Sequence, residues 1–189
     1  MNKKIIGLVL AVIVIASAVI LVVGYQPKPA QAPHYDVVGF VTQVVDGDTI
    51  DLWIEDVVAD LDPAGEIYED TDETVRFGGG VDAPELAHEG GPEAGNFTNG
   101  LCPLWTKIYL DLDNLAVGGR TGRPYRDKYE RLVAVIYVKL NGQWINVNAE
   151  LLRWGQEEYP DHDWLQYLYI TSDFDGREWL EENYSYVRG

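Results

Sequence analysis

The sequence has few cysteines, histidines and basic residues. Cys102 is its one cysteine, so no intrachain disulfide can form, and packing or a bound ion must stabilise the fold. The three histidines (His34, His88 and His162) lack zinc-ligand spacing, which argues against a structural zinc site. Lysine and arginine total 14 against 31 acidic residues, a formal net charge of -17. Such an acidic chain is not expected to bind phosphate backbones strongly without specific contacts.

The charges are unevenly distributed along the chain. Nine acidic residues lie within 55–73 and nine more within 157–182, whereas five basic residues lie within 120–131. An acidic domain with one basic strip can still hold a local anion site.

The N-terminal segment indicates a location at or beyond a membrane. Residues 5–24 contain no charge and follow Lys3 and Lys4. At 1.5 Å per residue they span roughly 30 Å, the thickness of a hydrocarbon core. Pro33 follows the small-residue triplet Ala30-Gln31-Ala32, which disfavours cleavage there, so we expect an uncleaved transmembrane anchor over a cleaved signal segment. In either case the rest of the chain lies outside, membrane-bound or secreted.

A Pro- and Ala-rich linker (25–33) precedes one folded domain, residues 34–189. Its apolar pattern predicts a mainly β fold with helices (α+β), because alternating, β-branched runs recur and are separated by turn residues. Asn141-Gly142 after the last long run predicts a type I′ hairpin turn. Such an order fits a small closed barrel with helices packed on it. The predicted strands are Val37–Val45, Thr49–Ile54, Thr74–Val81, Trp105–Leu112, Leu132–Leu140 and a short strand at 143–147.

Four helices are expected in the same domain. Glu93 lies in the first turn of a short helix at Pro92–Thr98. A second helix, Asn148–Trp154, is predicted to end at Gly155, a residue typical of C-caps. Further helices are expected at Trp164–Ile170 and around Glu178–Asn183.

Charged residues placed inside apolar stretches are the candidates for chemistry. Carboxylates from separate strand ends suit Ca²⁺ or Mg²⁺, and arginines suit phosphate because their planar forks bond two oxygens. The alternative is a set of independent turn aspartates and surface ion pairs. The residues are Asp46, Asp48, Arg76, Asp82, Glu85, Asp127, Lys128 and Arg131.

These residues lie in segments that resemble the staphylococcal nuclease-like, or thermonuclease, family over about residues 36–160. Five segments occur in the family's order, and the last contains a helix-ending Arg-x-Gly. The resemblance implies an OB-fold barrel of five strands with helices. The segments are "VVDGDTIDL" (44–52), "VRFGGGVDAPEL" (75–86), "GPEAGNFT" (91–98), "DKYERLVAVIYV" (127–138) and "INVNAELLRWG" (145–155).

The resemblance also implies roles for individual residues. Asp48 and Asp82 would coordinate Ca²⁺ together with the main-chain carbonyl of Ala83, and Asp46 would support them through water or by orienting the turn. Glu85 would position or deprotonate the attacking water. Arg76 and Arg131 would bind the scissile phosphate. Lys128 and Tyr129 would contact a neighbouring phosphate of the substrate.

Three departures from the family pattern bear on activity. Arg76 precedes Asp82 by six positions where the family usually has five, and a bulge within Gly78–Gly80 is expected to restore the phase of the strand. Glu130 replaces the usual glycine between the tyrosine and the arginine. The acidic 55–73 loop is longer than usual.

The resulting prediction is a monomeric, Ca²⁺-dependent and sequence-nonspecific nuclease. Its substrates would be DNA and RNA, and the resemblance implies cleavage that leaves 3′-phosphates. The alternative is a catalytically inactive relative that binds calcium or a partner at the cell surface. A third alternative is a surface adhesion or cell-wall module, which is supported only by the N-terminal anchor and the acidic charge.

Overall fold

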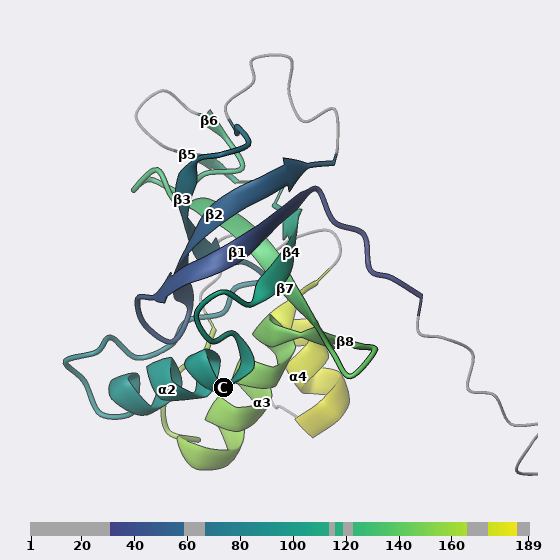
Figure 1. Cartoon of the computed structure of the whole chain (residues 1–189). Helices are drawn as coiled ribbons and strands as arrows, with labels where there is room; N and C mark the ends of the chain where they lie inside the picture. Colours follow the sequence, from purple (N-terminus) through teal and green to yellow (C-terminus); the bar gives the residue numbers. More distant parts are fainter. Residues whose placement is uncertain (1–30, 59–66, 114–115, 119–122, 166–173, 185–189) are drawn as a thin grey trace, which may run out of the picture. The chain divides into compact units, whose positions relative to one another are not determined.

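Five strands close into a barrel in the computed structural model, which describes residues 31–58, 67–113, 116–118, 123–165 and 174–184 (Figure 1). The sheet order is β3-β2-β1-β4-β7-β8, and a parallel pairing of β3 with β7 closes the ring. The predicted five-stranded barrel is therefore confirmed. The strands are β1 (Val37–Val44), β2 (Thr49–Val57), β3 (Asp72–Phe77), β4 (Lys107–Leu112), β7 (Leu132–Leu140) and β8 (Gln143–Asn146), with a separate ribbon of β5 (Val117–Gly118) and β6 (Arg123–Pro124).

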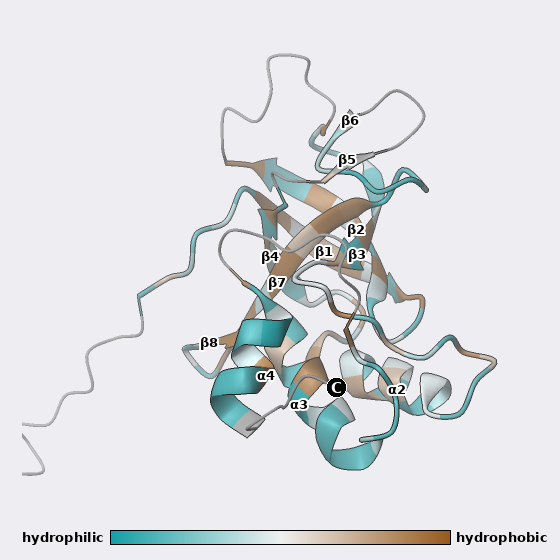
Figure 2. Ribbon diagram, turned by 180° about the vertical axis from the view of Figure 1, so that it is seen from behind, coloured by the Kyte–Doolittle hydropathy of each residue, from teal (hydrophilic) through white to brown (hydrophobic). Residues whose placement is uncertain are grey.

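The barrel interior is apolar because each strand directs branched side chains inward. Val41 of β1, Ile50 of β2, Val75 of β3 and Leu110 of β4 all have no exposed surface. Figure 2 shows the hydrophobic residues running along β7, whose Leu132–Ile136 stretch is fully buried. Burial of each of these side chains contributes about 1.5–3 kcal/mol to the stability of the folded state.

The β7–β8 connection has the predicted turn. Asn141 and Gly142 have φ values of 51° and 82°, the two positive angles that a type I′ turn requires. The hairpin prediction is confirmed, and it sets the register that pairs Leu140 with Gln143.

Three helices, α2 (Gly91–Leu101), α3 (Val147–Glu158) and α4 (Gly176–Tyr184), gather at one end of the barrel (Figure 1). The side chain of Asn146 caps α3 by accepting a hydrogen bond from the Ala149 amide at 3.0 Å. The predicted end of α3 at Gly155 is wrong, because the helix continues to Glu158. Gly155 serves packing instead: a Cβ there would lie 2.3 Å from the Trp164 ring.

The predicted helix at Trp164–Ile170 is described in part, and the predicted N-terminal anchor is not described. Trp164 and Leu165 are not helical, because Leu165 forms an isolated antiparallel bridge with Val81, so the Trp164–Ile170 helix is wrong at its start. Residues 166–170 lie outside the described residues, as do the segment 5–24 and residues 59–66 of the acidic loop. Within the described ranges, no helix is long and apolar enough to cross a bilayer. Residues 32–189 form a unit of their own.

Candidate active site

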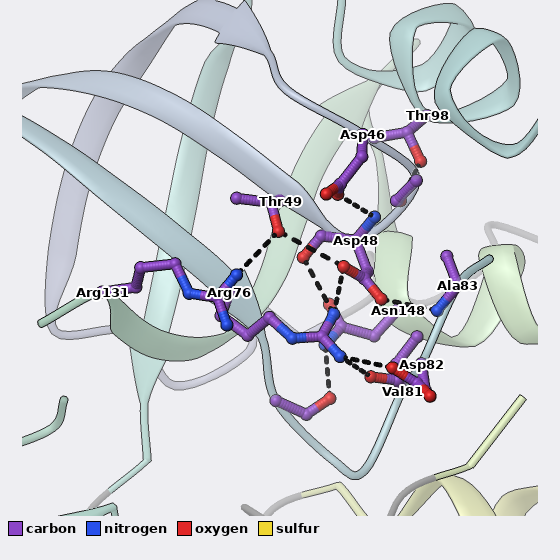
Figure 3. Close-up of polar contacts among 12 residues, drawn as sticks. Asp46, Asp48, Thr49, Arg76, Val81, Asp82, Ala83, Thr98, Arg131 and Asn148 are labelled. Atoms are coloured by element: carbon purple, nitrogen blue, oxygen red, sulfur yellow. Dashed lines mark hydrogen bonds and ion pairs between the residues drawn. The ribbon is translucent and has the colours of Figure 1, made fainter. Parts of the chain in front are cut away.

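The Asp46-Gly47-Asp48 turn between β1 and β2 is the first part of the site (Figure 3). The Asp48 amide donates to Asp46 Oδ1 at 3.1 Å, so the first carboxylate orients the turn that carries the second. Asp48 is 5% exposed. Gly47 is required by close packing rather than by a bend, since a Cβ there would lie 2.6 Å from Ala83 and 2.7 Å from Ala94.

Arg76, near the end of β3, points at this turn. Its guanidinium pairs with Asp48 Oδ1, and Nη2 lies 2.9 Å from Asp82 Oδ1 and donates to the Val81 carbonyl at 2.9 Å (Figure 3). The extra residue before Asp82 is accommodated by a turn after the strand, with Gly79 and Gly80 at φ 73° and 78°. Arg76 therefore faces the aspartates as expected. The extra residue is absorbed by a turn with two left-handed glycines and not by a β-bulge.

The segment after this turn brings Asp82, Ala83 and Glu85 to the same place. The Ala83 amide donates to Asp48 Oδ2 at 2.5 Å, which ties the segment to the aspartate turn. The side chain of Asp82 is 26% exposed. Glu85 is exposed and lines the same cavity as the aspartates.

The opposite wall of the cavity comes from the loop that leads into β7. Arg131 donates through Nε to Asp127 Oδ2 at 2.7 Å and through Nη1 to Thr49 Oγ1 at 3.4 Å (Figure 3 shows the latter). Asp127 has no exposed surface, and it also accepts from the amides of Tyr129 and Arg131. Lys128 and Tyr129 are exposed, with the ammonium 4.9 Å from the ring centroid.

All eight predicted side chains therefore meet at one cavity of about 240 Å³. Only Ala83, whose predicted role uses its main chain, does not line it. Asp127, Phe77 and Val81 complete the lining.

One comparison with known proteins identifies the domain. Residues 74–160 match the family model described as staphylococcal nuclease homologue. Residues 74–160 are part of a staphylococcal nuclease-like domain. No curated protein matches the chain significantly. The matched region begins inside β3, so the nuclease-like barrel is completed by β1 and β2, which carry Asp46 and Asp48 ahead of it.

The electrostatics of this nuclease-like site come from buried acids close together. Burial and the neighbouring charge of Asp48 raise the pKa of Asp46 to about 6. Burial on its own lowers the pKa of Arg76, but Asp48 and Asp82 outweigh it and raise that pKa. The aspartate turn thus carries negative charge, and Arg76 pairs with it through Asp48.

The donor set fits the Ca²⁺ ion that the family typically uses. Asp48 and Asp82 both contact one guanidinium, so their carboxylates converge on one region, and hard oxygen donors are what Ca²⁺ prefers. Burial, and after it the charge of Asp48, raises the pKa of Asp46, and a cation there would offset the second of these causes. Asp48, Asp82 and the Ala83 carbonyl would hold it, with Asp46 beside them.

A second group of possible metal ligands lies elsewhere. Within the described part of the chain, the one set of three or more His and acidic side chains with ligand atoms within 4.8 Å of one another is His34, Asp36 and Asp111. His34 Nδ1 and Asp111 Oδ1 are 3.2 Å apart. Sequence spacing did not suggest this group, because β4 brings Asp111 beside the start of β1.

Sequence reasoning assigned no role to Asp127, Arg126 or Thr49. Arg126 bonds both carboxylate oxygens of Glu73 at 2.7 and 2.9 Å, and its Nη1 donates to the Glu130 carbonyl at 2.7 Å. Arg126 is 4% exposed and so fixes the loop that presents Lys128 and Arg131. The available signal was an Arg-Asp pair in the short charged segment that precedes the apolar strand β7.

Proposed function

We propose that this protein is a Ca²⁺-dependent nuclease that hydrolyses phosphodiester bonds of DNA and RNA with little sequence preference. The observation that carries the proposal is the cavity in which an arginine of β3 and an arginine of the loop before β7 face carboxylates suited to a divalent cation. Its exposed rim of Lys128 and Tyr129 suits a flanking phosphate and a base or sugar.

The chain's own groups have separate tasks in this proposal. Arg131, anchored by Asp127, presents a cation whose position needs no rearrangement as charge develops on the phosphate. Arg76 supplies a second cation from the opposite wall. Glu85, exposed at the cavity edge, takes a proton from the attacking water. Bound Ca²⁺ would neutralise charge on the phosphate oxygens.

The test uses the full chain, single-stranded DNA, and either Ca²⁺ or a chelator. Cleavage that requires Ca²⁺ and falls about 10²–10³-fold in Glu85→Gln supports the nuclease. Glu89→Gln is the matched control, since it changes another exposed glutamate of the same loop. A folded protein that cleaves nothing in Ca²⁺ excludes the enzyme.

One observation favours the second candidate, an inactive calcium- or partner-binding module. Arg76 is bound to both carboxylates of the proposed ion site, and Glu130 adds a carboxylate beside Arg131. Calorimetric Ca²⁺ binding without any cleavage would support this module in place of the nuclease.

The location of the domain is a further part of the proposal. Residues 5–24 would anchor it in a membrane with residues 34–189 outside, or release it if cleaved. Protease treatment of intact cells, followed by fractionation, tests this: degradation of a membrane-bound domain supports the anchor.

A further inference from the structure

The Asp82–Ala83 peptide group is bonded on both of its edges. Its N–H, from Ala83, donates to Asp48 Oδ2 at 2.5 Å. Its carbonyl oxygen, from Asp82, lies 3.1 Å from Nε2 of His162. Because a carbonyl oxygen can only accept, Nε2 of His162 is the donor. A chain of hydrogen bonds therefore runs from His162 through one peptide plane to the Asp48 carboxylate.

The C-terminal segment holds this peptide from several directions. The Asp82 amide donates to the Trp164 carbonyl at 2.9 Å, and the Gly176 amide donates to the Gly79 carbonyl at 2.9 Å. Val81 bridges to Leu165. A Cβ on Gly79 would lie 2.3 Å from the Phe174 ring, so the glycine turn is packed directly beneath that ring.

His162 is itself held in place. Its backbone amide donates to the Tyr159 carbonyl at 3.1 Å, and its ring meets the Trp164 ring edge to face at 5.0 Å. Trp164 is 2% exposed and its Nε1 donates to the Tyr159 carbonyl at 3.0 Å. The half-buried imidazole thus approaches Asp82 from a fixed support, and not as a mobile surface group.

We infer that His162 is a positioning residue for the proposed nuclease site, which it orients through the Asp82–Ala83 peptide. This inference rests on the proposed function. His162 does not itself line the cavity and reaches it only through the main chain of Asp82, and it lies beyond the residues that match the family. Loss of its donor would remove the restraint on the carbonyl edge of the peptide, so the peptide plane could tilt and shift both the Asp82 side chain and the Ala83 amide. Hydrogen bonds in such chains also polarise one another.

A matched pair of amides tests this in the full chain. In His162→Gln the side-chain nitrogen can occupy the place of Nε2, whereas in His162→Asn it is one carbon too short to reach. We expect H162N to lower kcat on single-stranded DNA at saturating Ca²⁺ about 10–100-fold with little change in KM, and H162Q to recover most of it. The control is His88→Asn in the exposed loop, which should match the wild type.

A second readout does not depend on activity. The ¹H–¹⁵N resonance of the Ala83 amide should shift in H162N and remain near its wild-type position in H162Q. If the wild type cleaves nothing, the proposed nuclease fails while this resonance still decides the positioning role. An unmoved Ala83 resonance in H162N, or equal kcat values in folded H162N and H162Q, overturns the inference. Should H162N not fold, H162A takes its place in both comparisons.

Discussion

The two arginines of the cavity lie in different surroundings. Arg76 is 8% exposed, and its guanidinium is bound to Asp48, Asp82 and a main-chain carbonyl. The Arg131 side chain is 26% exposed, and its carboxylate partner is Asp127, which lies on its own side of the cavity.

Because their partners differ, Arg76 and Arg131 are expected to have different roles. The carboxylates that bind Arg76 are those proposed for the ion, so its freedom to meet a phosphate depends on what else neutralises them. The partner of Arg131 is not a proposed ligand, and its guanidinium can face substrate without breaking that pair. Arg76 should therefore matter most for metal-free stability, and Arg131 for catalysis.

Replacing Arg76 by alanine should have the largest effect on stability. It leaves Asp48 and Asp82 uncompensated, and breaking such a buried pair costs about 3–5 kcal/mol. Urea unfolding in chelator measures this loss, and added Ca²⁺ should restore part of it. The control is Arg153→Ala, whose exposed pairs on α3 contribute about 0–1 kcal/mol. Equal losses in the two variants would contradict the distinction between the arginines.

Replacing Arg131 by alanine should lower kcat about 10²–10³-fold, because a preorganised cation facing the phosphate is lost. Its effect on stability should be smaller than that of R76A, about 1–3 kcal/mol, since Asp127 keeps two backbone donors. Steady-state kinetics and unfolding of the same sample measure both. Lys139→Ala, outside the cavity, should leave kcat unchanged. A stability loss in R131A larger than in R76A would reverse the comparison.

Asp46→Asn should change how stability depends on pH. The folded pKa of about 6 lies above the ordinary 3.8, so the folded state binds more protons between these values. The contribution of Asp46 is therefore most favourable below pH 3.8 and is lost as pH rises through 6. Metal-free D46N should be more stable than wild type at pH 7, and this gain should vanish near pH 4. Unfolding free energies across pH 4–7 measure it, and parallel curves would contradict it.

Glu130→Gly should have the smallest effect, and it should be stabilising. Glu130 has φ 70°, a left-handed conformation that costs a residue with a Cβ about 1 kcal/mol. Glycine keeps the main-chain carbonyl that accepts from Arg126. Thermal unfolding should show the gain, with Asn141→Gly as a control that gains less because asparagine tolerates φ 51°. A lower Tm for E130G would show that the Glu130 side chain matters more than its backbone strain.

Much of the fold was predictable because its signals are local. Alternating β-branched runs located the barrel strands, and Asn141-Gly142 located the hairpin turn. The end of α3 was not predictable, since glycine at 155 is also the residue that lets Trp164 pack closely. The site shows the same division. Its charged residues, Asp127 among them, could be chosen from the sequence. That Asp127 is buried and anchors Arg131, and that His162 is linked to Asp82, could not.

The sequence by itself determined the strand pattern, the turn chemistry and which charged residues stand within apolar segments, because these depend on neighbours a few positions apart. Only the tertiary structure decided that Arg76 faces Asp48 and Asp82 despite the extra residue. That outcome depends on how the Gly79–Gly80 turn packs against Phe174, almost a hundred residues later in the chain. Residue spacing in the sequence cannot predict a contact between residues so far apart, because such a contact forms only when the whole core packs.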